Sequence, residues 1–72
     1  MNKFKVGDVL LGRYSGRTVM IIGETIDIFK LLCLNDKIDM AMDKAHIADI
    51  YDYAIDLEEY EDKIIQIKAE LV

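Results

Sequence analysis

The chain has 72 residues, of which 53% are hydrophobic, a single cysteine and a formal net charge of −5 at pH 7. This length predicts one domain near the lower limit for folding without disulfides or metal, and the hydrophobic content excludes disorder. One cysteine excludes an internal disulfide, and because no apolar run exceeds four residues we expect a cytoplasmic protein without a membrane span.

Two turn signals bracket the first apolar segment and predict a hairpin. Residues 5–8, Lys-Val-Gly-Asp, are typical of a turn, and an apolar strand is expected at 9–14. Ser15-Gly16 provides the residue with a positive φ angle that a tight connection requires. A second, largely β-branched strand is then expected at 17–22.

The middle of the chain predicts two further strands and a helical turn. After a turn at 23–25, the segment 28–34 is so continuously apolar that we expect a central strand covered on both faces. At 38–43 apolar residues alternate with aspartate or alanine, which predicts a fourth strand with one exposed face. Residues 44–49 fit a single turn of helix.

In the last part of the chain the apolar period changes from two to that of a helix. Alternation at 51–57 predicts a fifth strand, and apolar spacings of three and four predict an amphipathic helix at 57–72. We expect the side chain of Asp56 to cap this helix by accepting a hydrogen bond from the backbone amide of Glu59. The side chain of Glu59 would in turn accept a hydrogen bond from the backbone amide of Asp56. The chain is therefore expected to be mainly β with one C-terminal helix.

A second interpretation of the same residues stays open. The apolar residues at 47, 50, 51, 54 and 57 also satisfy helical spacing, and no glycine or proline interrupts 43–72. That segment would then form one or two helices on a three- or four-stranded antiparallel sheet, an α+β arrangement. Strict alternation at 51–57, in tyrosine and isoleucine that favour strands, supports the five-strand interpretation.

The order of elements resembles a known small fold. Five short strands, the Lys-Val-Gly-Asp turn and a helical turn between strands four and five are similar to a Src-homology-3-like barrel. More narrowly, residues 4–57 resemble small barrel proteins encoded by bacteriophages and mobile elements of low-GC bacteria. The matching segments are 5–9, 18–22 and 42–47, leading into Tyr51. The resemblance implies a five-stranded barrel at 1–56, with the helix at 57–72 outside it.

No residue cluster has the spacing of a catalytic or metal site, so we expect no enzyme and no cofactor. His46 is the only histidine and has no serine or cysteine nucleophile near it in sequence. Asp36, Asp39 and Asp43 lack the glycine and the terminal glutamate of a calcium-binding loop. Cys33 lies in an apolar run, where a buried and inert thiol is expected.

The charge is distributed unevenly along the chain. Through Leu34 five basic residues exceed three acids, whereas from Asn35 onward eleven acids face four lysines. Direct nucleic-acid binding is disfavoured, because phosphate contacts need lysine and arginine. An acidic belt of this kind either keeps a small protein soluble or steers it onto a basic partner protein. The acids expected to contact such a partner are Asp39, Asp43, Asp49, Asp52, Asp56, Glu58, Glu59, Glu61 and Asp62.

These observations predict a non-catalytic, acidic protein-binding accessory factor, most concretely a phage-encoded inhibitor of a host defence or nucleic-acid-processing protein. One alternative is a nucleic-acid- or ribosome-associated barrel that uses the basic first half of the chain. Its contact residues would be Lys3, Lys5, Arg13, Tyr14, Arg17 and Lys30. A further alternative is a structural subunit that assembles through the helix.

Self-association through the apolar stripe of the helix is a related hypothesis. The stripe consists of Leu57, Tyr60, Ile64, Ile67 and Leu71. The charges that flank it match only in an antiparallel homodimer, because a parallel pair would set lysine against lysine. Packing of the same stripe on the strands of its own chain is the competing expectation.

Overall fold

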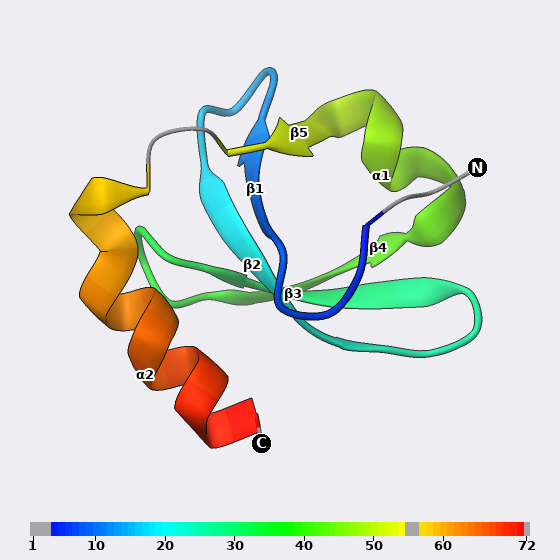
Figure 1. Cartoon of the computed structure of the whole chain (residues 1–72). Coiled ribbons are helices and arrows are strands. Elements are labelled where there is room, and N and C mark those ends of the chain that lie inside the picture. The colour runs from blue at the N-terminus through cyan, green and yellow to red at the C-terminus, as the bar shows by residue number, and fades with distance from the viewer. Residues whose placement is uncertain (1–3, 55–56, 72) are drawn as a thin grey trace.

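The computed structural model (Figure 1) describes residues 4–54 and 57–71. Its elements, in chain order, are β1 (Val9–Gly12), β2 (Thr18–Glu24), β3 (Ile28–Cys33), β4 (Asp39–Asp43), α1 (Lys44–Ile50), β5 (Tyr51–Tyr53), the 3₁₀ turn η1 (Glu58–Tyr60) and α2 (Glu61–Leu71). The strands form one antiparallel sheet in the order β4-β3-β2-β1-β5. The expected mainly β class with a C-terminal helix is confirmed. A wholly helical segment at 43–72 is wrong, because β5 pairs with β1.

The sheet is open at both edges. Among the described residues, β4 pairs only with β3, and β5 pairs only with β1. β5 ends at Tyr53, whereas the alternation predicted a strand at 51–57, and α1 provides the connection between the two edge strands. Closure of the sheet into a barrel is therefore not seen.

Two glycines lie where the backbone needs a positive φ angle. Gly7 has φ 99°, and the turn around it is closed by a hydrogen bond from the amide of Asp8 to the carbonyl of Lys5 at 3.0 Å. The amide of Gly7 donates to the carbonyl of Ile21 at 2.8 Å, which fixes this turn on β2. Gly16 has φ 70° in the connection between β1 and β2. Both of these predicted turns are confirmed.

The predicted turn at 23–25 is wrong, because β2 continues to Glu24. The register of β2 on β3 shifts between Ile21 and Gly23, so a bulge absorbs one residue and lets the pairing resume. The chain turns two residues later, where the amide of Thr25 donates to the carbonyl of Ile28 at 2.8 Å. A glycine inside a strand marks a bulge as readily as a turn.

The strand that is covered on both faces is β2. Its residues Val19, Met20 and Ile21 are fully buried although consecutive side chains point to opposite faces. In β3 only alternate residues are buried, whereas Ile28 and Lys30 on its other face are exposed. The prediction that 28–34 is covered on both faces is therefore wrong. β2 has that position because it is the middle strand of the five.

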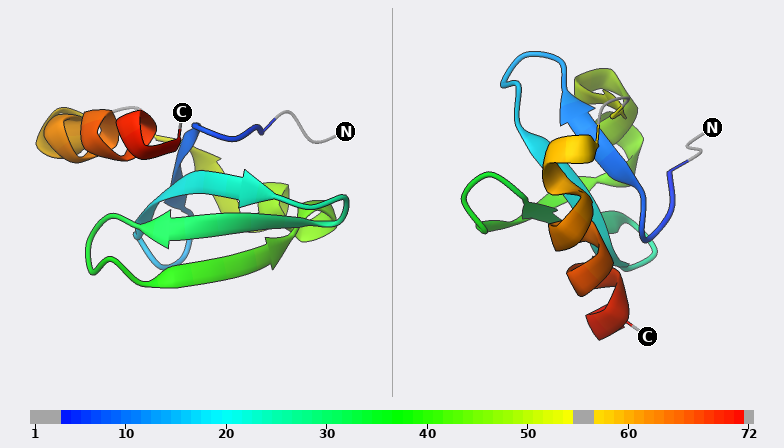
Figure 2. Two further views of the ribbon diagram at one scale, coloured as in Figure 1. Left: turned by 90° about the horizontal axis from the view of Figure 1, so that it is seen from below. Right: turned by 60° about the vertical axis from the view of Figure 1, so that its left-hand side comes forward.

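The two faces of the sheet carry separate hydrophobic clusters, each closed by a helix. On one face Ile47 of α1 and Tyr51 of β5 pack with residues such as Leu10 and Leu31. On the other face Ile64 of α2 packs with Met20 and its neighbours. Figure 2 shows α2 as a layer over the strands, with α1 at the opposite side of the molecule. Within the described ranges no helix has the length and apolarity needed to cross a bilayer.

Candidate protein-binding surface on α2

The apolar stripe of the C-terminal helix packs on the sheet of its own chain. Ile64 is 8% exposed and contacts the cluster of Val9, Met20 and Leu34. Leu57, Tyr60 and Ile67 are half-buried around the same cluster, and the side chain of Leu71 lies outside the described part of the structure. A homodimer through this stripe would have to displace these contacts. The homodimer stays a prediction.

Two polar contacts fix α2 and η1 to the turn that follows β3. The side-chain amide of Asn35 donates to the hydroxyl of Tyr60 at 2.6 Å, and its oxygen accepts from the amide of Thr18 at 3.0 Å. The ammonium of Lys63 donates to the carbonyl of Leu34 at 3.3 Å. The helix begins at Glu58 as a 3₁₀ turn with no side-chain cap at Leu57. The predicted cap, Asp56, lies outside the described residues.

One flank of the helix combines acids with exposed apolar surface. Glu58 and Glu61 line an open cavity of about 420 Å³ together with Leu57, Ile64 and Ile65. Ile65 is 61% exposed, and it lies one helical turn beyond Glu61 on the same side of α2. This acidic flank, defined as Leu57, Glu58, Glu61 and Ile65, therefore presents an apolar contact point beside two carboxylates.

The other two acids at the start of the helix lie away from this cavity. Both are exposed, Glu59 in the first turn of η1 and Asp62 in the first turn of α2. Acids at that position interact favourably with the positive end of the helix dipole, which is a sufficient structural reason for them.

The acids of β4 form a second, separate group. Asp39 and Asp43 lie at the two ends of the strand, are exposed, and share one face of the sheet because they are four residues apart. They stand opposite Leu32 and Ile28 of β3 in the register of the sheet. This pair is separate from the acidic flank of α2, because no residue of β4 lines the cavity beside Glu58 and Glu61.

The third group lies around Arg13, which neutralises part of its charge. The guanidinium of Arg13 donates to both carboxylate oxygens of Asp52 at 2.7 Å, and a further nitrogen donates to the carbonyl of Asp49 at 3.3 Å. The hydrogen bonds from Arg13 hold the pKa of Asp52 below its usual value and raise the pKa of Arg13. Asp52 is thus an ion-pair partner within the chain.

The described residues contain no group of three or more histidine, cysteine or acidic residues that could hold a metal ion. His46 is exposed on α1, and Cys33 is fully buried, as expected for an inert thiol. No protein-family model, curated protein or solved structure matches the chain. Function is therefore inferred from the surface chemistry of the chain itself.

A second cavity in the structure has no counterpart among the sequence predictions. It lies on the opposite flank of α2 and is lined in part by Lys37 and Lys63. Neither lysine belongs to a recognisable sequence motif. Lys37 has a φ angle of 60°, a left-handed conformation that is uncommon for a residue other than glycine. The turn residues Asn35-Asp36 before it were a signal for a tight connection, but they did not indicate a ligand.

Proposed function

We propose that this chain is a non-catalytic binding protein that presents the acidic flank of α2 to a basic partner protein. The observation that supports the proposal is the juxtaposition of Glu61 with Ile65, which stays 61% exposed although its neighbour Ile64 is buried. An exposed apolar side chain beside a cavity provides a contact that a partner can desolvate. The carboxylates provide the charge that selects a basic partner.

The net charge of the whole chain also favours association with a basic partner. A net charge of −5 on 72 residues attracts a basic surface before contact and speeds association. Arg13 offsets part of the charge around Asp52, and the acids of β4 lie in a separate group. We therefore assign the short-range contact to the acidic flank and the long-range attraction to the remaining acids.

The biological setting that we propose is that of a phage-type accessory factor, an inhibitor of a host defence or nucleic-acid-processing protein in the host cytoplasm. The support for it is the likeness to a Src-homology-3-like barrel. Four consecutive antiparallel strands, a short helix between β4 and β5, and the return of β5 to β1 are compatible with such a barrel. Closure would require β4 and β5 to meet beyond α1.

Affinity capture from a lysate of the encoding organism or its host, with quantitative mass spectrometry, tests the proposal. Ile65→Ser and Glu61→Gln should each reduce recovery of the captured protein on the order of tenfold, the loss expected for one buried contact or one charge pair. The association rate should fall as salt rises past about 0.15 M, where the Debye length is about 8 Å. The captured protein should be basic.

Matched control variants separate the site from general charge. Asp39→Asn combined with Asp43→Asn removes two exposed acids from β4, and this variant should retain the affinity of the unmodified chain within a few fold. Equal losses in the α2 and β4 variants would refute the assignment of the site to α2. Binding of labelled DNA at low salt, with no captured protein, would favour the alternative nucleic-acid function instead.

A further inference from the structure

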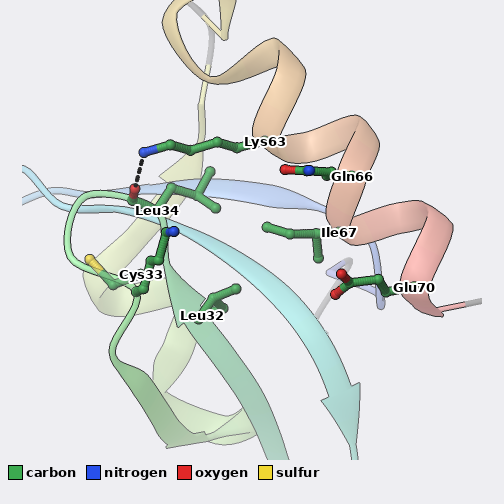
Figure 3. A pocket seen from close by; sticks show the side chains of 8 residues that line it. Leu32, Cys33, Leu34, Lys63, Gln66, Ile67 and Glu70 are labelled. Carbon is green, nitrogen blue, oxygen red and sulfur yellow. Dashed lines mark hydrogen bonds between the residues drawn. The ribbon is translucent and has the colours of Figure 1, made fainter.

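The cavity on the other flank of α2 has a different chemistry from the acidic flank. It has a volume of about 340 Å³ and lies between α2 and the region where β3 ends and the chain turns (Figure 3). Leu32, Leu34 and Ile67 supply its apolar walls, and the side chains of Leu32 and Ile67 extend into the space between strand and helix. The volume falls within the range of small-molecule sites, roughly 300–1,000 Å³.

Two lysines and one glutamate provide the charged groups of this cavity. Lys37 and Lys63 line it together with Glu70, which leaves one net positive charge. Lys63 donates one hydrogen bond, to the carbonyl of Leu34, although an ammonium carries three donors. Within the described ranges neither lysine has a carboxylate within 4.0 Å, since the ion pairs there involve Arg13 and Lys44. Both lysines can therefore donate to an anionic ligand.

The backbone of Lys37 is a second, independent observation at the same place. This lysine ends the turn after β3 with a φ angle of 60°, where its amide donates to the carbonyl of Cys33 at 2.8 Å. Glycine adopts this conformation without a steric cost, whereas the Cβ atom of any other residue makes it unfavourable. A lysine held in a costly conformation at the rim of a cavity points to a function of its side chain.

We propose that this cavity binds an aliphatic carboxylate. The hydrocarbon body would lie against Leu32 and Ile67, and the carboxylate would accept hydrogen bonds from Lys37 and Lys63. A single carboxylate matches the one net positive charge, whereas a phosphate would bring a second negative charge close to Glu70. Such a carboxylate is either a free medium-chain acid or the C-terminus of a peptide that ends in an aliphatic residue.

The ligand of this cavity is distinct from the basic partner protein that we propose for the acidic flank. The residues involved, Lys37, Lys63 and Ile67, line the flank of α2 that lies away from Glu61 and Ile65. A variant of either flank can therefore fail to bind its own ligand without affecting the other flank. One set of variants can therefore test the binding of each ligand separately.

Titration of the full chain with sodium octanoate, followed by amide chemical shifts in ¹H–¹⁵N NMR spectra, tests the inference. Shifts should saturate and be confined to residues 32–37 and 63–70. Octanamide has the same shape without the negative charge and should bind on the order of tenfold more weakly, because its neutral carbonyl cannot form an ion pair with the ammonium groups of the two lysines. N-acetyl-leucine compared with its amide distinguishes a peptide C-terminus from a free acid as the source.

Lysine variants give the decisive comparison. Lys37→Gln and Lys63→Gln should each weaken octanoate binding several-fold, while Lys30→Gln and Lys68→Gln, which change exposed lysines elsewhere, should leave it unchanged. Circular dichroism verifies that each variant is folded. Shifts that rise linearly without saturation, or equal affinity for octanoate and octanamide, would overturn the proposal. So would equal losses in the control lysine variants.

Discussion

Replacing Ile64 by alanine tests the packing of α2 on the sheet more directly than any other change. Ile64→Ala removes three carbon atoms from a side chain that is 8% exposed and packs on Val9, Met20 and Leu34. At about 0.8 kcal/mol for each buried carbon, the lost transfer free energy is about 2 kcal/mol. The cavity term is small, because the site lies beside open space into which neighbours can relax.

The neighbouring residue provides a matched control in the same helix. Ile65 is 61% exposed, so Ile65→Ala loses about 0.9 kcal/mol of transfer free energy by the same reckoning. Alanine regains about 0.4 kcal/mol through its higher helix propensity in either variant. The free energy of unfolding should therefore fall by about 2 kcal/mol for Ile64→Ala and by about 0.5 kcal/mol for Ile65→Ala.

Urea denaturation followed by circular dichroism measures both values. A domain of this size has a total stability of about 4–11 kcal/mol, so the loss at Ile64 should lower the melting temperature by about 8–16 °C. Equal effects of the two variants would refute the described packing of α2. Ile64→Asp extends the test to self-association: we expect loss of the folded state rather than a folded monomer, because Ile64 packs within its own chain.

Three further predictions concern single residues. Lys37→Gly should raise the free energy of unfolding by about 0.5 kcal/mol, because relief of the left-handed conformation exceeds the added unfolded-chain entropy of glycine. Lys37→Ala keeps a Cβ atom and should give no gain in the same urea experiment. The hydrogen bond from Arg13 lowers the pKa of Asp52 in the folded state, so its stabilisation is present above the unfolded value of about 3.9 and is lost as pH falls through the folded pKa. In the Asp52→Asn variant the free energy of unfolding should therefore decrease less steeply as pH falls than in the unmodified chain. Burial raises the pKa of Tyr51, so its stabilisation is complete below about pH 10 and is lost as pH rises through the folded pKa; Tyr51→Phe should make thermal stability less sensitive to alkaline pH.

Local patterns predicted most of the strands because local chemistry decides them. Gly7 and Gly16 adopt positive φ angles, which glycine reaches without a steric cost, so the glycines marked these turns in the sequence. The alternation at 38–43 was visible because β4 has one exposed face. The helix at the C-terminus was visible because its apolar residues recur with the period of a helix.

Features that depend on the arrangement of the sheet could not be predicted in this way. β2 rather than β3 is covered on both faces because of its central place in the strand order, which no local pattern encodes. Gly23 lies in a bulge rather than in a turn, since pairing with β3 continues past it. The acids seemed continuous along the chain, but the fold distributes Asp43, Asp52 and Glu61 among three separate places.

The outer edge of β4 has a consequence for the behaviour of the protein at high concentration. An unpaired strand edge is a template for growth of a fibril, because another strand can add to it through backbone hydrogen bonds. Antiparallel addition of a second copy centred on Ala41 would set Asp39 of each copy opposite Asp43 of the other, so like charges oppose it at neutral pH. Near the isoelectric point of about 4.6 the net charge of each copy vanishes, and with it the net repulsion between copies. Lowering the pH towards this value therefore weakens the electrostatic barrier to addition of a second copy at β4.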